Sequence, residues 1–358
     1  GILDLHCSLV VSELCLRDSS EGTASGSRVR EGELEGVGSV SETIEGEMDL
    51  TEGSASASRD RQAEIDGVGS AGDTIEAEMN LSEGTASGSR IREGELEGVG
   101  SVSETIEGEM DLTEGSASAS VDRRGELEGV GSVSETTEAE MNLSEGTASG
   151  SQVREGEIEG VGSASDSIEG ELDLTEGEVS AGREQELDLE GVGEIGQSQE
   201  GEIDLGDGTA SAGMERSAGI DGLGSVGQDA EGSLDLTKGQ VGASTETTGG
   251  IDGVGSASQS QHGDLNISEG SAELGSSTSA ELGGGLVDAG QETSGSADFN
   301  PFDGDAGIEA GSEVGGSIAG IGLGANAGGE FGIGADGVNT EAELGGNVAG
   351  LEVGAEAE

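Results

Sequence analysis

Acidic side chains recur along this 358-residue chain at positions separated by multiples of 31 residues. Five positions of the well-kept repeats are almost always glutamate or aspartate, and at a sixth aspartate alternates with asparagine. The first copies of these six positions are Glu33, Glu35, Glu45, Glu47, Asp49 and Glu52. Carboxylate oxygens are the ligands that calcium prefers, so Ca2+ is the candidate ion for them, and no other cofactor is predicted. The alternative is a solvated acidic face that binds no metal.

The other residues with reactive side chains form no catalytic pattern. His6 and His262 are remote from each other in sequence and have no repeated partner. The chain contains no nucleophile elbow, phosphate-binding loop or zinc-ligand spacing. We therefore predict that the protein is not an enzyme. Cys7 and Cys15 either form one local bridge, join neighbouring chains or remain two thiols, and the sequence leaves these alternatives open.

The formal net charge of −64 limits the classes of partner. Nucleic acids need clusters of lysine and arginine, and Lys238 is the only lysine. Such a surface attracts divalent cations or basic partners, or suits a habitat of high salt. No stretch has the roughly 18 apolar residues of a membrane helix, so no membrane span is predicted. The first residue is Gly1 and not methionine, which fits a processed, secreted product and equally fits a trimmed sequence.

One unit of 31 residues organises the chain, and its first full copy is GVGSVSETIEGEMDLTEGSASASRDRQAEID at 36–66. Its first glycine returns without insertion or deletion at Gly36, Gly67, Gly98, Gly129, Gly160, Gly191, Gly222 and Gly253. A chain that tolerated loops between repeats would drift in length. The fixed spacing predicts that every repeat is one structural turn, stacked on a copy of itself.

Within the unit, apolar residues alternate with polar ones. Ile44, Gly46, Met48 and Leu50 alternate with acidic residues and a threonine, which predicts a strand with one apolar and one acidic face. The spacing of three between Leu34, Val37 and Val40 predicts short strands bent at glycine corners. The Ser/Ala run at 54–58 is a third strand or a flat turn. Helices are not expected, because glycine and serine are too frequent.

These patterns predict an all-β fold, a β-solenoid or β-arch repeat array with 31-residue units and a 62-residue superperiod. In a solenoid, each unit is one coil and equivalent residues stack about 4.8 Å apart. In an antiparallel array, an odd number of strands per unit would make the true period 62 residues. Odd units read GEMDLTEGSASAS and even units AEMNLSEGTASGS. We favour the solenoid, because stacking would pair each Asp49-type aspartate with an asparagine.

Three regions follow from the repeat: an N-terminal cap or donated strand (1–20), regular β-repeats (21–275) and degenerate glycine-rich β-repeats (276–358). Pro301 is the expected interruption of the last region. The first region is apolar and either covers the first repeat or adds a strand to a neighbouring subunit. Its candidate assembly residues are Leu3, Leu5, Leu9, Val10 and Val11.

Stacked carboxylates pose an electrostatic problem. Two like charges about 4.8 Å apart repel by roughly 0.9 kcal/mol in water. Cations, salt or partial protonation would have to reduce this repulsion. The arginines of the repeats, such as Arg28 and Arg59, are too few to neutralise the carboxylates. Asparagines at the Asp49-type position soften the charge. They also begin Asn-x-Ser sequons, so they are glycosylation candidates: Asn80, Asn142 and Asn266.

The glycine-rich periodic strands resemble those of extracellular repeat β-proteins. This group includes curli-like amyloid subunits, fibrous adhesin stalks and the β-arch sheath proteins of some methanogenic archaea. The resemblance is one of architecture and transfers no role to any residue. It implies a structural protein, extracellular or at the cell surface, that binds copies of itself into a fibre, tube or sheath. The alternative is a monomeric adhesin stalk or an acidic, cation-binding matrix protein.

Overall fold

The computed structural model describes residues 7–11, 17–18, 22–282, 287–300, 305–318, 321–334, 337–348 and 351–357. The chain has two compact units, Gly1–Thr175 and Glu176–Glu358. Both are built from β-strands, and no helix occurs in the described ranges. Accordingly, the described residues contain no helix that is long and apolar enough to cross a membrane. The all-β repeat fold predicted from the sequence is confirmed.

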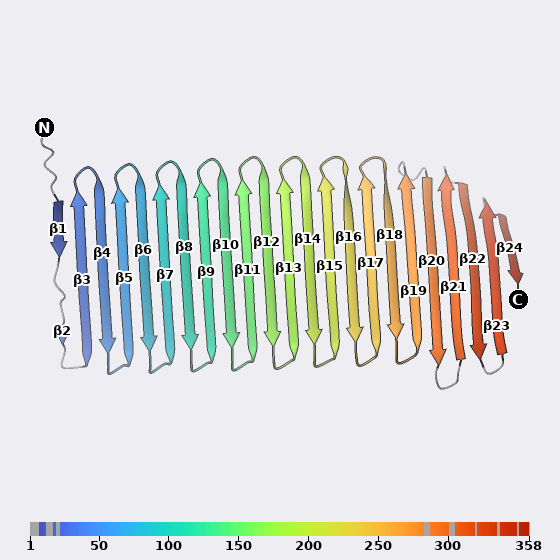
Figure 1. Ribbon diagram of the computed structural model, residues 1–358, viewed down its shortest axis with the longest axis horizontal. Helices are drawn as coiled ribbons and strands as arrows, with labels where there is room; N and C mark the ends of the chain where they lie inside the picture. The colour runs from blue at the N-terminus through green and yellow to red at the C-terminus, as the bar shows by residue number, and fades with distance from the viewer. Residues whose placement is uncertain are drawn as a thin grey trace. The chain divides into compact units, whose positions relative to one another are not determined.

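The first unit is an antiparallel sheet in which successive strands from β3 onward pair in chain order (Figure 1). Two short strands, β1 and β2, both pair with β3. The strands of this unit are β1 (Cys7–Val11), β2 (Arg17–Asp18), β3 (Thr23–Leu34), β4 (Gly38–Asp49), β5 (Ser54–Ile65), β6 (Gly69–Asn80), β7 (Thr85–Leu96), β8 (Gly100–Asp111), β9 (Ser116–Leu127), β10 (Gly131–Asn142), β11 (Thr147–Ile158) and β12 (Gly162–Asp173).

The second unit repeats this plan with slightly longer strands toward its end, and its strands also pair antiparallel in chain order. The strands are β13 (Glu178–Leu189), β14 (Gly193–Asp204), β15 (Thr209–Ile220), β16 (Gly224–Asp235), β17 (Gln240–Ile251), β18 (Gly255–Asn266), β19 (Ser271–Leu282), β20 (Val287–Asn300), β21 (Asp305–Ile318), β22 (Ile321–Gly334), β23 (Gly337–Val348) and β24 (Leu351–Ala357). The predicted interruption at Pro301 lies outside the described residues.

Each regular repeat contributes two strands, joined by a turn of three residues and followed by a turn of four. In the shorter turn the Val37 N–H donates to the Leu34 carbonyl over 2.9 Å, and Gly36 has φ +75°. This geometry fits a type II turn, whose third residue needs a positive φ and is therefore glycine. The next glycine is required by space, because a Cβ on Gly38 would lie 2.0 Å from the Glu64 carbonyl oxygen. The Gly-x-Gly motif is thus explained.

The four-residue turn is held by its own side chain. The Asp49 carboxylate accepts the Thr51 N–H over 2.7 Å and the Glu52 N–H over 3.1 Å. The Gly53 N–H donates to the Asp49 carbonyl over 2.8 Å, and Gly53 has φ +74°. An aspartate or asparagine at the start and a glycine at the end are the residues that such a turn favours.

Equivalent turns also bind one another, which explains why the length of the regular repeats does not vary. At one end of the strands the Leu81 N–H donates to the Gly53 carbonyl over 2.9 Å, and the Ser82 hydroxyl donates to the Glu52 carbonyl. At the opposite end the Glu97 N–H donates to the Val68 carbonyl over 2.9 Å. Because each turn accepts hydrogen bonds from the next one, an inserted residue would break a contact on both sides of it.

The antiparallel arrangement was only the alternative to the favoured solenoid, and one detail of it was predicted wrongly. A 31-residue unit contains two strands, not an odd number, so chain direction is restored after every unit. Equivalent residues such as Met48 and Met79 therefore lie two strands apart, about 9.6 Å, with a different residue between them. Leu50 belongs to the turn and not to the strand. The Ser/Ala run at 54–58 is neither a turn nor a separate strand but the beginning of β5.

Candidate functional site

The two faces of the sheet differ sharply in chemistry. No described side chain is buried, so neither face is covered. Residues that the register places opposite one another on successive strands share a face, and we call such a set a row. In unit 1 the face that includes Val40, Ile44 and Met48 holds every exposed large apolar residue of the strands except Ile91. We call it the apolar face, and the opposite one the acidic face.

The apolar face of unit 1 has charges in one central row and the row beside it. In the central row, arginine and carboxylate alternate on ten successive strands. The row consists of Arg30, Glu42, Arg61, Asp73, Arg92, Glu104, Arg123, Glu135, Arg154 and Asp166. Arg28, Arg59 and Arg90 lie in the neighbouring row. On β3–β12 the apolar face therefore carries eight arginines and five carboxylates, a net formal charge of +3.

Short ion pairs connect this central row. Glu42 accepts from Arg59 at 2.6 Å and from Arg61 at 2.9 Å. Farther along, Glu104 lies 3.1 Å from Arg92 and 3.0 Å from Arg123. The hydrogen bond from Arg123, together with the nearby positive charges, holds the pKa of the Glu104 carboxyl below its usual value. Opposite charges placed directly across strands stabilise a sheet, whereas like charges destabilise it.

The pKa values of two further carboxyl groups of the row are lowered in the same way. Hydrogen bonds from Arg90 and Arg92 lower the pKa of Asp73, and bonds from Arg154 and Arg123 lower that of Glu135. The pKa of the Arg123 guanidinium is raised in return by Glu104 and Glu135. The Asp73, Glu104 and Glu135 carboxylates therefore remain charged at neutral pH.

The corresponding row in unit 2 is mostly uncharged. Its members on β13–β20 are Gln185, Gln197, Arg216, Gln228, Thr247, Gln259, Thr278 and Gln291. On β13–β19 the apolar face carries no carboxylate, and its charges are Arg183 and Arg216. The arginine–carboxylate ladder is thus a feature of unit 1.

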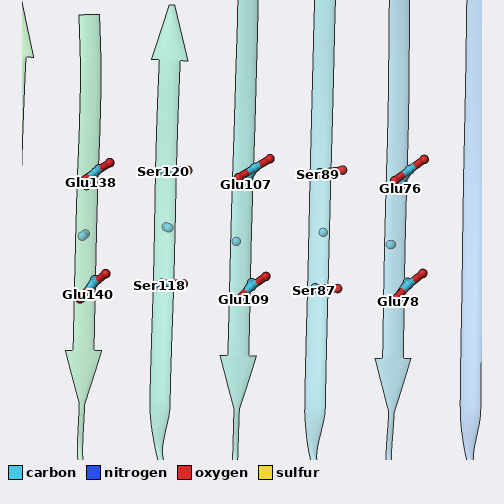
Figure 2. A pocket seen from close by; sticks show the side chains of 15 residues that line it. Glu76, Glu78, Ser87, Ser89, Glu107, Glu109, Ser118, Ser120, Glu138 and Glu140 are labelled. Atoms are coloured by element: carbon cyan, nitrogen blue, oxygen red, sulfur yellow. The ribbon is translucent and has the colours of Figure 1, made fainter.

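The acidic face of unit 1 carries almost all of the negative charge of its strands. On β3–β12 it presents twenty-three carboxylates and one arginine, Arg124. Pairs of glutamates on one strand alternate with pairs of serines on the next, which leaves a shallow groove above the serines (Figure 2). The labelled residues of the groove are Glu76, Glu78, Ser87, Ser89, Glu107, Glu109, Ser118, Ser120, Glu138 and Glu140.

This alternation changes the predicted carboxylate columns. Glu45 faces Ser27 and Ser58 on its two neighbouring strands, and Glu47 faces Ser25 and Ser56. Like charges of one column are therefore about 9.6 Å apart, and they repel by only about 0.4 kcal/mol in water. The expected stacking at about 4.8 Å was wrong because it assumed one coil per repeat. The arginines do not screen these columns, since Arg28 and Arg59 lie on the other face.

The remaining predicted ion ligands lie apart from one another. Glu33 is on β3 opposite Ser39, Glu35 and Glu52 are in the two kinds of turn, and Asp49 caps the longer turn. Hydrogen bonds from the Glu52 and Thr51 N–H groups lower the pKa of Asp49. In the part of the chain that the structure describes, no three carboxylate, histidine or cysteine side chains converge on one point. Calcium binding stays a prediction.

The asparagines have the same structural role as Asp49. The Asn80 side-chain oxygen accepts the N–H of Ser82 over 3.0 Å and of Glu83 over 3.2 Å, and Asn142 accepts equivalent bonds. Asn266 accepts the Glu269 N–H over 3.1 Å and the Ser268 hydroxyl over 2.7 Å. The Asp/Asn alternation therefore preserves a turn cap, and neighbouring members of the set do not stack directly on each other. Glycosylation at these residues stays a prediction.

The N-terminal assembly segment partly covers the first long strand. β1 pairs with β3, with Leu9 opposite Gly32, Val10 opposite Glu31 and Val11 opposite Arg30. β2 pairs with Ser25 and Ala24. Leu3 and Leu5 lie outside the described residues. The pairing is within one chain, and it leaves the choice between a cap and a donated strand open.

Sequence reasoning missed the central row of the apolar face. Its members are separated alternately by 12 and 19 residues, as from Arg30 to Glu42 and from Glu42 to Arg61. A search for complementary charges at these two offsets would have found the row, whereas alignment at 31 residues finds only its identical members. No protein-family model matches this chain, and no curated protein matches it either.

Proposed function

We propose that this is a structural protein that assembles with copies of itself into an extracellular fibre, tube or sheath through β-strand pairing between subunits. The observation that carries the proposal is the repeated antiparallel hairpin, together with an edge at β24, which pairs only with β23 among the described residues. β1 and β2 cover residues 30–34 and 24–25 of β3. β24 covers only residues 342–348 of β23. Unpaired backbone groups on such edges are templates for another strand.

The architecture supports a structural role over a catalytic one. The described side chains are not buried, and they form a repeating surface rather than one distinctive pocket. The Glu/Ser pattern of the groove recurs on β3–β12, so successive strand pairs of unit 1 present the same chemistry. Repetition of this kind suits a polymer or a matrix. The acidic face keeps neighbouring polymers apart by charge, or joins them where divalent cations bridge the carboxylates.

Negative-stain electron microscopy of the purified protein, with calcium and with a chelator, tests this function. We expect regular filaments, tubes or sheets, and their loss in the chelator would identify cations as a bridging agent. Deletion of residues 1–20 tests whether the N-terminal segment takes part in the joint. Dispersed single particles under both conditions would contradict self-assembly and favour the monomeric stalk or matrix protein.

A further inference from the structure

We propose that the apolar face of unit 1 is an interface with a second copy of this chain, in which two sheets pack face to face with their acidic faces outward. This surface is distinct from the strand edges of the proposed polymer. Its uncovered residues are large: Val102 is 64% exposed, Leu127 53% and Met110 47%. Uncovered apolar patches larger than a few hundred Å² are rare on soluble proteins and mark interaction sites.

The area is sufficient for a stable pairing. Strands β3–β12 are ten strands of twelve residues each. At about 3.4 Å per residue and about 4.8 Å between strands, the face measures roughly 40 Å by 48 Å. Contact over this area would remove about 1,900 Å² from water on each copy, against about 800 Å² in an interface of standard size. A pairing over half of the face would therefore still be adequate.

Charge selects a second copy and decides which faces meet. Between the acidic faces of two copies, twenty-three carboxylates on each side would repel one another. The apolar faces carry only +3 each, and their charges alternate in sign along the central row. When two such rows approach, arginines of one copy can lie beside carboxylates of the other. The pairing therefore buries the least charged surface of the unit and leaves the acidic one in water.

The sizes of the side chains on the apolar face indicate how the faces of two copies would pack together. One row is small on every strand from β3 to β12: Gly26, Gly46, Ala57, Ala77, Gly88, Gly108, Ala119, Ala139, Gly150 and Gly170. We call it the Gly/Ala row. The adjacent row holds a methionine on every second strand from β4 to β10, such as Met110. A two-fold axis parallel to the strands, between β7 and β8, would place the Gly/Ala rows of the two copies over each other, with Met110 of each copy over Ala86 of the other and Arg92 over Glu104.

A single sheet gives no reason for the glycines of this row. Their φ angles are not in the positive range, and a Cβ on Gly108 would lie 3.8 Å from its nearest neighbour, the Ser118 carbonyl oxygen. That is ordinary contact. Glycine inside a strand weakens it, and its presence commonly marks the close approach of another backbone. In Figure 1 the axes of the antiparallel strands of unit 1 are also aligned with one another, without marked twist. Broad flat sheets are usually stabilised by stacking.

Two matched substitutions test the interface by sedimentation velocity over a range of protein concentrations. Gly108→Val adds two methyl groups beyond Cβ on the apolar face, and Gly72→Val adds the same atoms on the acidic face. A Cβ on Gly72 would also be in ordinary contact, 3.9 Å from the Arg61 carbonyl oxygen. We expect Gly108→Val to weaken face-to-face association at least tenfold and Gly72→Val to leave it unchanged. Equal association of both variants and the wild-type protein would overturn the proposal.

A second measurement does not depend on how well those variants fold. In a chain with Cys7 and Cys15 replaced by serine, Ala119→Cys places a thiol on the apolar face and Ser118→Cys places one on the acidic face. We expect a soluble maleimide to label position 119 at least ten times more slowly than position 118 in the associated protein. Equal rates would overturn the proposal. So would protection of position 119 in a strictly monomeric protein, which would mean that another part of the same chain covers the face.

The face-to-face pairing and the proposed polymer can be tested separately. In a chain lacking residues 1–20, loss of filaments with retention of a two-chain species and of the protection at position 119 would support the face-to-face pairing while refuting the N-terminal joint. Filaments with equal labelling at both positions would support the polymer and refute the pairing. Binding to vesicles of neutral lipid by a monomer with an accessible position 119 would refute the pairing in favour of a lipid surface.

Discussion

The central row of the apolar face differs between the two units of the molecule. In unit 1 it alternates Arg92, Glu104 and Arg123 with short ion pairs, whereas in unit 2 the equivalent residues include Gln228 and Gln259. Strands β3–β12 and β13–β19 all have twelve residues, and both sets have glycines of positive φ in their turns. The backbone architecture therefore depends on the glycine turns and on alternation along the strand. The central row can be satisfied either by paired charges or by neutral hydrogen-bonding side chains.

The largest expected effect tests the feature that the two units share. Gly100→Ala and Gly224→Ala should each destabilise their unit by about 3 kcal/mol or more, because the added Cβ would lie 1.9 Å and 2.0 Å from a backbone oxygen. Gly98→Ala is the matched control. It has an unfavourable φ of +69° but open space around it, so its cost should be about 1 kcal/mol. Thermal unfolding measures both. Equal costs at positions 98 and 100 would contradict the steric account.

A charge placed on the apolar face is expected to have the next largest effect. Met110→Glu in unit 1 and Ile203→Glu in unit 2 replace side chains that are 47% exposed in each case. In assembled protein with a covered face, Met110→Glu should cost about 3 kcal/mol or more. In a single sheet the cost should be within about 0.5 kcal/mol. Denaturant titration of assembled and dispersed protein gives the comparison. A small cost at position 110 in both states would show that the face remains in water.

Acid should lower the stability of unit 1 relative to that of unit 2. The pKa values of Asp73, Glu104 and Glu135 are lowered by their arginines, so these groups stabilise unit 1 fully above the ordinary carboxyl pKa of about 4. Their contribution is lost as the pH falls through the lowered values. Hydrogen exchange should therefore show unit 1 losing protection relative to unit 2 below about pH 4.

The variant Glu104→Gln sharpens this comparison, because it imitates the protonated ladder at neutral pH. Backbone amides of β7–β9 should exchange faster in this variant, whereas those of β15–β17 should not change. The converse change in unit 2, Gln228→Glu, places a carboxylate opposite Arg216 and should slow exchange there at neutral pH but not in acid. Uniform behaviour of both units would show that the ladder contributes little to stability.

The smallest effects are expected at the turn caps, which occur in both units. Asn142→Ala removes the side-chain oxygen that accepts the N–H groups of Ser144 and Glu145, and it should cost about 0.5–1 kcal/mol. Asn142→Asp retains the oxygen and should change stability little. Thermal unfolding again measures both variants. A cost for the aspartate equal to that of the alanine would indicate that charge, and not turn geometry, explains the Asp/Asn alternation.

Much of the fold could be predicted from the sequence, because local rules determine it. Alternation around Ile44 and Met48 correctly gave a strand with two unlike faces, and the invariant 31-residue spacing correctly gave one repeated β unit for every 31 residues. The number of strands per repeat could not be predicted in the same way. It depends on whether Gly36 makes a bend within a coil or reverses the chain, and glycine permits both.

The face on which each arginine lies could not be predicted for the same reason. Without the turn lengths of three and four residues, Arg61 cannot be aligned with both Glu42 and Asp73. The arginines were therefore counted against carboxylates that lie on the opposite face. The apolar rows were visible in the sequence, but the absence of buried residues among the described ones was not, because periodicity does not reveal whether a face is covered.

The bonds between equivalent turns also have a mechanical consequence. Tension applied to the ends of unit 1 would load its backbone hydrogen bonds one pair of strands at a time, as in opening a zipper. Because each turn is fastened to the next, the natural step of rupture is a whole hairpin of 31 residues. Each step would release about 100 Å of chain, at roughly 3.4 Å per residue. A material made of such sheets would yield in many small, equal and reversible steps, and so would absorb strain without breaking.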